Sequence, residues 1–591
     1  MNRIALLTLS IFSLIGCRQP QEKEAKDIKD LSVLTDQYYE DRLKLYPLEA
    51  TSVGDDRYND LLPNNGSAKF IQQEYTFYQK YLNQLKTYER DILDENDKLS
   101  YDILEDELTM GLEAKKYHFE YMPFDQFNSL PLVMGQLGSG EGMQPFKTVK
   151  DYNHWLKRIS AFSIWADTAI TNFQKGTQKG IVLPRPLVVK MIIQMQSMIV
   201  KDPTKSLFYG PIKKMPKTFP EATKKWLTEA YSKVILTEVV PTYKKLGDYL
   251  QNEYLPKSRN TSGLSALPGG KDMYIFLVKQ QTTTPKSPEE IYQTGLQEVA
   301  RISAKMDSVK TQVGFKGSLK AFFNYMKDDP KFMPYKTPKD VLDAFENIHK
   351  TMEPNLKKMF KNTPKTPFEI RQTEDFRAAT ASAEYNQGSA DGKRPGIFYV
   401  PILDAKKFNI TSGMESLFLH EAIPGHHYQI SLQQENTSLP KFRRFGSFYN
   451  AYVEGWALYC ESLGKELGLY TDPYQYMGAL GDEMHRAVRL VVDVAIHTKG
   501  MTREQAIKYM MDHEAISEQG AIAEIERYMA MPAQALGYKV GAMKIQELRK
   551  RYQKNMRGKF NLADFHDQLL NDGPMPLNIL EKKMDAWAAS Y

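Results

Sequence analysis

The chain has 591 residues, a length that permits one large domain or two ordinary ones. Hydrophobic residues make up 42% of the sequence and charged residues 25%, the proportions of a globular protein. The formal net charge of +6 at pH 7 is small for this length. Composition therefore gives no support for binding to nucleic acid.

The N-terminus has the pattern of an export signal. Arg3 precedes an apolar run, Ile4 to Ile15, that is too short to span a bilayer as an anchor. The tetrapeptide from Leu14 to Cys17 resembles a bacterial lipobox, in which the cysteine is lipidated and becomes the first residue of the mature chain. A plain signal peptide is the alternative. We predict a lipoprotein signal over residues 1–17.

The residues after this signal indicate how the mature protein is held. Residues 18–30 are rich in charge, and we expect them to form a flexible tether. Arg18 rather than aspartate follows the cysteine, which resembles outer-membrane sorting in enteric bacteria. We therefore predict a lipid anchor at Cys17 in the cell envelope, on the periplasmic or external face of the outer membrane. Only Cys460 remains in the mature chain, so no internal disulfide can form.

Most of the remaining chain is predicted to be helical. Apolar residues recur at spacings of three and four, most clearly over 68–93, 149–175, 221–254, 288–313 and 338–360. Strand-like pieces lie just before a histidine cluster, at 367–372, 379–385 and 396–402. We predict a mainly α fold over 31–591, a single large helical catalytic domain with a small β-sheet beside the active-site helix.

Three of the ten histidines fall within eight residues, in the stretch "SLFLHEAIPGHHYQ". His420 is followed by Glu421, as in the zinc signature His-Glu-x-x-His. The next histidines, His426 and His427, come later than that signature requires. The stretch is either a zinc site with an insertion or a coincidence of core and surface histidines in a long helix.

The Pro-Gly pair between the histidines decides whether they can share a metal. A capping box at residues 412–415 predicts that a helix begins shortly before His420. In a regular helix, His420 and His426 would be about 600° apart, on different faces. Pro424 must kink or bulge the helix, because its ring clashes with a carbonyl of the preceding turn. If two residues loop out there, His426 becomes the second ligand, with His427 as its competitor.

A tetrahedral zinc needs a third protein ligand and an open position for water. Glu454 lies within an apolar and aromatic segment, residues 447–464, where a carboxylate is costly to bury without a positive partner. A metal would be such a partner, and a salt bridge with an arginine is the alternative. Glu461, seven positions later on the same helical face, is predicted to orient a ligating histidine. We predict that zinc is bound by His420, His426 and Glu454.

The pattern His-Glu-x-x-Pro-Gly-His-His followed by Glu-Gly-Trp-Ala-Leu-Tyr resembles the bacterial family called domain of unknown function 885 (DUF885). The resemblance covers almost the whole mature chain, including the segments 391–400, 489–506 and 526–541. This family is similar to divergent zinc peptidases with a glutamate ligand (gluzincins) and a largely helical fold. The resemblance implies zinc and peptidase chemistry but no particular substrate.

Glu421, adjacent to a ligand, is the predicted general base for a zinc-activated water. The tetrahedral oxyanion needs another donor, for which His497, Tyr528 and Tyr538 are the candidates. For each tyrosine, simple packing is the alternative.

Other residues are predicted to line the site. Arg489 and Asp493 have opposite charges one helical turn apart, and they form either a wall of the site or a solvated ion pair. Asp493 is assigned to the shell around the ligands, whereas the predicted substrate-binding residues are His427, Arg489, Arg527, Gln534 and Tyr399.

Tyr399 lies in the apolar segment 395–402, which follows a turn signal at Asp391 and Gly392. We interpret this segment as an edge strand beside the cleft, where an extended peptide could pair with the backbone. A core strand is the alternative.

Together these features predict a zinc-dependent peptidase, anchored by a lipid, that acts on a peptide or a small amide substrate. Two alternatives remain open at the level of sequence. One is a catalytically inactive, peptide-binding lipoprotein, and the other is a zinc hydrolase of a non-peptide amide or ester.

Overall fold

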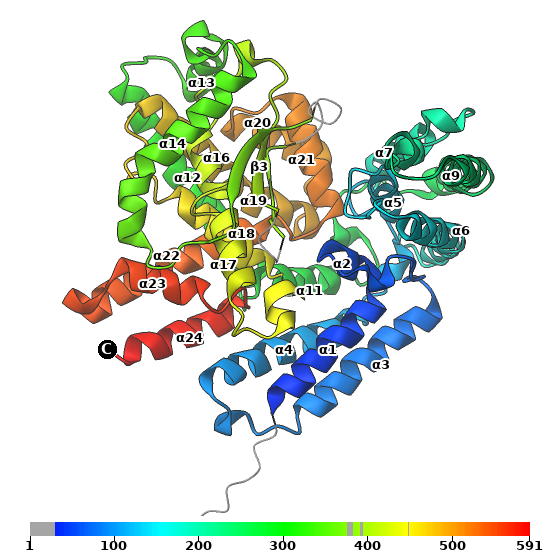
Figure 1. Cartoon of the computed structure of the whole chain (residues 1–591). Helices are drawn as coiled ribbons and strands as arrows, with labels where there is room; N and C mark the ends of the chain where they lie inside the picture. Colours follow the sequence, from blue (N-terminus) through cyan, green and yellow to red (C-terminus); the bar gives the residue numbers. More distant parts are fainter. Residues whose placement is uncertain (1–29, 375–381, 390–393, 447) are drawn as a thin grey trace, which may run out of the picture.

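The computed structural model describes residues 30–374, 382–389, 394–446 and 448–591. Cys17, the tether before residue 30, and the turn predicted at Asp391 and Gly392 lie outside the described residues. Helices dominate, and the sheet in the described part is small (Figure 1), so the predicted mainly α fold is confirmed. None of the helices within those ranges is both long and apolar enough to cross a membrane.

Two groups of helices flank the part of the chain that carries the histidine cluster (Figure 1). One forms a layer at one end of the molecule: α1 (Leu31–Leu45), α2 (Pro47–Ser52), α3 (Ala68–Leu85) and α4 (Glu95–Ala114). The other stands to one side around an apolar core of its own: α5 (Leu130–Gly138), α6 (Val149–Gln178), α7 (Arg185–Ser197), α8 (Gly210–Lys213), α9 (Glu221–Val234) and α10 (Val240–Tyr249). A π-helical turn separates α9 from α10, within the segment predicted as one helix.

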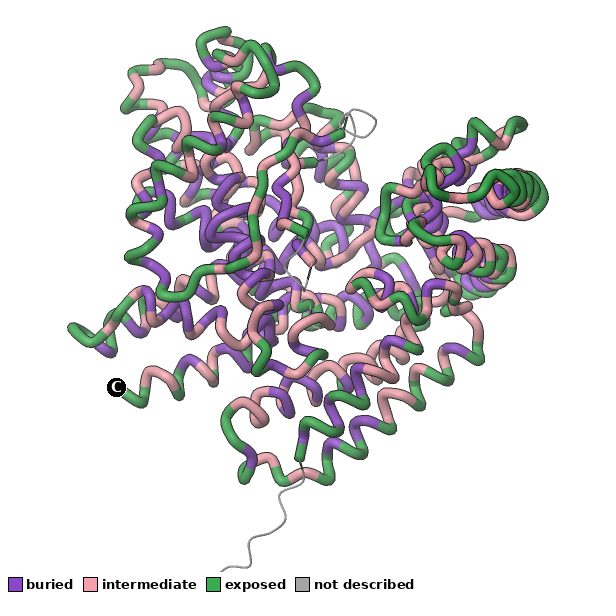
Figure 2. The backbone as a smooth tube through the Cα atoms, viewed as in Figure 1, coloured by how far each residue is buried: buried purple, intermediate pink, exposed green. Residues whose placement is uncertain are grey.

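The central body holds the remaining helices. Before the sheet come α11 (Gly270–Thr282), α12 (Pro288–Gln312), α13 (Leu319–Asp328) and α14 (Pro338–Met359). After it come α16 (Met414–Glu421), α17 (His426–Glu435), α18 (Asn450–Glu461), α19 (Pro473–Thr498), α20 (Arg503–His513), α21 (Glu518–Ala530), α22 (Leu536–Met556), α23 (Leu562–Leu570) and α24 (Leu577–Ala589). Figure 2 shows that many of the buried residues lie in this body.

Helix α18 is enclosed on nearly all sides, because every one of its residues except Glu454 is buried. It packs closely on α22, and glycines make this approach possible. A Cβ atom on Gly455 would lie only 2.6 Å from Cα of Gly541. Since the two backbones almost touch, the N-terminal turns of α22 are held beside the carboxylate of α18.

The sheet has the order β1 (Phe368–Gln372), β3 (Gly396–Val400), β2 (Glu384–Asn386). β3 pairs in parallel with β1 and antiparallel with β2, with Tyr399 opposite Arg371 and Glu384. The prediction of an edge strand at 395–402 is therefore wrong. The apolar side chains of β3 are buried because β3 is the central strand. Its backbone already pairs with a strand on each side.

Helix α16 begins close to the predicted position but without the predicted capping box. Ser412 Oγ donates to Asn409 O at 2.6 Å, and Glu415 accepts the amide of Tyr470 at 2.7 Å. Gly413 occupies the N-cap with a φ of 78°, a conformation that side chains of L-residues rarely adopt. The helix start is thus fixed by this glycine and by long-range contacts.

Candidate metal centre

The two histidines of the motif lie on two different helices. His420 is in the last turn of α16, and His426 is the first residue of α17. Residues 422–425 form a bend between them, with a cis peptide bond between Ile423 and Pro424. The predicted kink is therefore a complete break, and the intervening residues leave the helical path.

Contacts on both sides hold this bend. Trp456 Nε1 in α18 donates to Pro424 O at 2.9 Å. A Cβ atom on Gly425 would lie 1.9 Å from His420 O and 2.4 Å from Leu419 O. Only glycine fits there, and because the backbone folds back onto the end of α16, it brings His426 beside His420.

Three side chains converge at this point. The rings of His420 and His426 have centroids 4.9 Å apart and are perpendicular. Glu454 Oε2 lies 3.5 Å from His420 Nε2 and 3.6 Å from His426 Nε2. Ligand atoms of a tetrahedral zinc, at about 2.0–2.1 Å from the metal, are separated from one another by about 3.3–3.5 Å. The three residues therefore fit a zinc ion in donor type, and the two distances to Glu454 are close to the separation that zinc ligands require.

A second carboxylate orients the first histidine. His420 Nδ1 donates to Glu461 Oε1 at 2.7 Å, and the exposed fractions of the two side chains are 4% and 5%. Burial disfavours the charged ring, but the carboxylates Glu454 and Glu461 outweigh burial and raise the pKa of His420 to about 10. The same imidazoles lower the pKa of Glu454, although burial opposes this shift. The two carboxylates thus stabilise positive charge on His420. The hydrogen bond from Nδ1 to Glu461 directs Nε2 of His420 toward Glu454.

Glu421 stands beside this cluster. Its Oε2 accepts the amide of Tyr385, in strand β2, at 3.0 Å. One ligand-capable atom from each of His420, Glu421 and His426 lies within 4.8 Å of the other two. A strand of the sheet therefore holds this carboxylate next to the two histidines.

His427 points away from the cluster. Its ring packs on Phe368, with centroids 4.8 Å apart, and Nδ1 lies 3.1 Å from Tyr385 Oη and 3.3 Å from Ser431 Oγ. Burial lowers its pKa to about 4. The prediction that it binds substrate is wrong, because the side chain is buried against the sheet.

Of the three predicted oxyanion donors, the structure places Tyr538 at the cluster. Its ring stacks on His420, with centroids 6.4 Å apart and planes 17° apart. His497 is fully buried, accepts the amide of Leu264 at Nδ1 and donates from Nε2 to Tyr528 O. Burial lowers its pKa to about 3. Both ring nitrogens bond to backbone, so the catalytic role predicted for His497 is wrong.

The hydroxyl of Tyr528 is also hydrogen-bonded to other side chains. Its hydroxyl donates to Glu524 at 2.6 Å and accepts from Arg489 Nε at 2.9 Å. Arg489 forms its ion pair with Glu524, at 3.0 Å, and its guanidinium lies 4.7 Å above the ring of Tyr538. Tyr528 therefore orients Arg489, and the oxyanion role predicted for it is wrong.

Asp493 was predicted to lie in the shell around the ligands, with an ion pair to Arg489 as the alternative, and its hydrogen bonds go to other residues. It accepts from Tyr274 Oη at 2.6 Å and from the amide of Ala533 at 3.1 Å. Burial raises its pKa to about 7. This carboxyl group connects α19 with α11 and with the loop before α22. The prediction that Asp493 orients a metal ligand is therefore wrong, because the group holds packed elements together.

Arg527 and Gln534 brace the start of α18. Arg527 donates to Gln534 Oε1 at 2.8 Å, and Asn450, the first residue of α18, donates to Gln534 O at 2.7 Å. Asn450 lies one helical turn before Glu454 on α18. Tyr399 is on the central strand, where it is paired with Arg371 of β1 and Glu384 of β2.

Sequence reasoning missed residues that hold the site rather than form it. Tyr385 positions Glu421, and Trp456 fixes the bend. Tyr385 lies in a segment predicted as a strand, and Trp456 lies in the Glu-Gly-Trp-Ala-Leu-Tyr motif. Arg486, whose guanidinium is 3.8 Å from Glu461 Oε1, had no local signal. Only the folded chain brings it there.

Fold and site together define a class: a mainly helical protein in which two imidazoles and a carboxylate converge beside a second carboxylate. The chain belongs to the DUF885 family, described as "Bacterial protein of unknown function", whose model matches residues 47–584. No curated protein matches the sequence.

Two solved structures share the fold. A "putative lipoprotein" from Colwellia psychrerythraea is 28% identical, with a TM-score of 0.86, and the match covers 95% of this chain and 99% of that one. A "putative lipoprotein of unknown function" from Shewanella oneidensis is 19% identical, with a TM-score of 0.73, covering 94% and 100%.

Proposed function

We propose that the chain is a zinc-dependent peptidase held at the cell envelope by a lipid on Cys17. The observation that carries the hydrolase proposal is the approach of His420 Nε2 and His426 Nε2 to one oxygen of Glu454, at 3.5 and 3.6 Å. The motif's resemblance to zinc peptidases supports a peptide substrate. The likeness to two structures described as lipoproteins supports the anchor.

Zinc bound by His420, His426 and Glu454 would supply a Lewis acid that polarises a carbonyl and acidifies a water. Glu421 Oε1 would take a proton from the attacking water, since Oε2 accepts the Tyr385 amide, and would pass it to the leaving amine. Tyr538 is the remaining candidate to donate to the oxyanion, because it lies between His420 and Arg489.

The test compares the wild-type protein with Glu421→Gln in two measurements, zinc content and hydrolysis of a mixed peptide library. We expect both proteins to hold zinc, because Glu421 is not among the proposed ligands. Turnover should fall by at least about 10²–10⁴-fold, since glutamine cannot accept the proton. Glu353→Gln, an exposed change on α14, serves as the matched control.

Undiminished hydrolysis by Glu421→Gln would overturn the mechanism even if zinc were present. A zinc-loaded wild-type protein that cleaves no peptide would overturn the peptidase proposal. Cleavage of simple amides or esters by the same protein would then identify it as a hydrolase of another class.

A further inference from the structure

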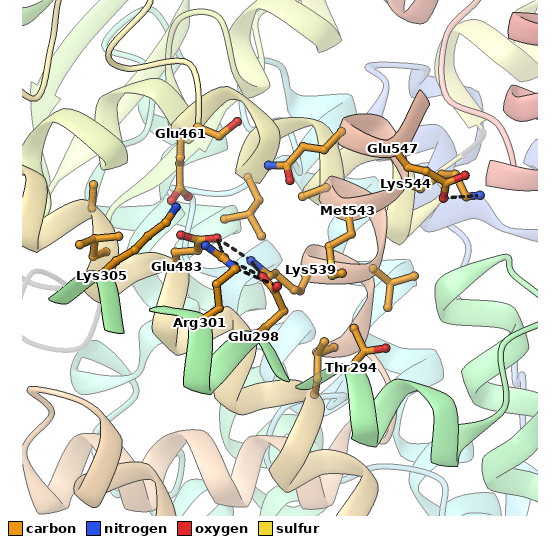
Figure 3. Close-up of a pocket in the computed structure, with 18 of the residues that line it drawn as sticks. Thr294, Glu298, Arg301, Lys305, Glu461, Glu483, Lys539, Met543, Lys544 and Glu547 are labelled. Carbon is orange, nitrogen blue, oxygen red and sulfur yellow. Dashed lines mark hydrogen bonds and ion pairs between the residues drawn. The ribbon is translucent and has the colours of Figure 1, made fainter. Parts of the chain in front are cut away.

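A cavity of about 680 Å³ lies between α12, α18, α19 and α22 (Figure 3). None of His420, Glu421, His426 and Glu454 lines it. Glu461 does, so the cavity backs onto the metal centre and shares one wall with it. Its size is within the range of sites that enclose small molecules.

The lining of this cavity is rich in charge of both signs, with positive charge in excess. Seven lysine or arginine side chains and four glutamates line it, a net charge of +3 when all are ionised. The cavity reaches from buried to exposed residues. The exposed fractions of the Lys539 and Glu461 side chains are 4% and 5%, whereas that of Glu547 is 50%. The cavity therefore has a buried end and a solvent-facing end.

Two of the glutamates are already neutralised. Lys539 Nζ lies 2.8 Å from Glu298 and 2.7 Å from Glu483, and Arg301 pairs with the same two carboxylates (Figure 3). Burial opposes ionisation of Glu298, but Arg301 and Lys539 outweigh it and lower its pKa to about 2. These four groups form a closed network. Of the other lysines of the cavity, Lys544 pairs with Glu547 at 3.0 Å, whereas Lys305 and Lys465 form no ion pair with the described residues.

Lys305 is one of those lysines, and Figure 3 shows it extending along the wall toward Glu461. Lys305 forms no ion pair within 4.0 Å among the described residues. Burial and Arg301 lower its pKa, although Glu483 and Glu298 oppose this shift from a greater distance. Lys465 also lacks a carboxylate within that distance, and its ammonium lies 4.0 Å above the ring of Tyr476. Neither ammonium forms an ion pair of its own within 4.0 Å, so a bound anion would supply a direct counter-charge.

Part of the remaining wall is apolar. Leu458, Leu480, Val540 and Met543 contribute hydrophobic surface between the lysines. Such a wall suits a ligand with a carbon skeleton rather than a bare inorganic ion. We propose that the cavity binds a small organic polyanion, with two or more carboxylate or phosphate groups on a short carbon skeleton, through Lys305 and Lys465.

Calorimetric titration of the full mature chain with tricarballylate and with fructose 1,6-bisphosphate tests this proposal. The two probes separate carboxylate from phosphate recognition. We expect at least one of them to bind, and Lys305→Gln and Lys465→Gln each to raise its Kd by about tenfold or more, as for the loss of a hydrogen bond to a charged group. Raising the ionic strength should weaken binding further. Lys320→Gln, an exposed change on α13, should have no effect.

A further variant separates the cavity from the metal centre. Glu454→Gln removes a proposed metal ligand that does not line the cavity, and it should bind the probe as the wild-type protein does. Three results would each overturn the proposal. They are the absence of binding by either probe at millimolar concentration, an unchanged Kd in both lysine variants, and loss of binding in Glu454→Gln.

Discussion

Glu461 accepts a hydrogen bond from His420 Nδ1 at 2.7 Å, from a position two helical turns beyond Glu454 on the same helix. One helix therefore supplies both a proposed ligand and the group that orients the histidine opposite it. Glu461→Gln keeps the size of the side chain but removes its charge. We expect the affinity for zinc to fall by about 10–100-fold. Competition with a chelator of known affinity would measure this change.

Glu466→Gln provides a control on the same stretch of chain, because this side chain is 45% exposed and pairs with Arg549 at the surface. Equal zinc affinities of Glu461→Gln and the wild-type protein would contradict the orienting role.

The proposed ligands make a second prediction. His420→Ala, His426→Ala and Glu454→Ala should each sharply lower the zinc content measured by mass spectrometry. His427→Ala should lower it much less, because His427 packs on Phe368 and faces Tyr385. Loss of zinc in His427→Ala with retention in His426→Ala would reverse the assignment.

The bend at residues 422–425 makes a third prediction. Gly425→Ala would place a methyl group 1.9 Å from His420 O, so the bend must open. We expect a loss of stability of about 3 kcal/mol or more, together with loss of zinc. Gly481→Ala, in α19, has nothing within 4 Å of the added Cβ and should be neutral or slightly stabilising. Thermal unfolding with zinc analysis would compare the two variants. A Gly425→Ala protein with normal zinc content would refute the steric requirement.

The buried carboxyl of Asp493 makes the pH dependence of folding testable. Its pKa in the folded chain is about 7, and the ordinary value is 3.8. Between these values the folded state binds more protons than the unfolded state, so stability falls as the pH rises through that range. A shift of about 3 units corresponds to about 4 kcal/mol. Asp493→Asn should remove this part of the loss between pH 4 and pH 7, as measured by urea unfolding. Parallel pH profiles of the two proteins would show that Asp493 does not titrate in this way.

Anchoring makes the fifth prediction. The residues before Cys17 form a lipobox-like pattern, so Cys17→Ser should release the mature protein from the membrane fraction. Immunoblotting of fractionated cells checks this outcome. Equal membrane association of the two proteins would exclude lipidation at Cys17.

Helical periodicity predicted the architecture well, because each long helix carries its own apolar stripe. The order of the strands could not be predicted, since it depends on contacts between segments more than ten residues apart. β3 is apolar because the other two strands and the helices cover it, and an edge strand beside a cleft would look similar in sequence.

In the candidate site, too, some roles could be predicted from local sequence and others depend on long-range contacts. His420, His426 and Glu454 were predicted from a local pattern and a buried charge, and the structure brings all three together. Asp493 was assigned to the site because its charge is opposite to that of Arg489 one helical turn away, and His497 was assigned to it as a candidate oxyanion donor. Polar residues that satisfy buried backbone groups give the same pattern, and only the fold distinguishes the two roles.

The break between α16 and α17 also bears on how relatives of this chain can be found. Five residues separate His420 from His426 in the sequence, whereas the familiar zinc signature allows only three between its histidines. A text search built on that signature passes over this arrangement, although the imidazoles meet in space. A broader search string would tolerate two additional letters after the glutamate, and it would have to retain the glycine directly before the second histidine, because the carbonyl of His420 leaves no room for another side chain there.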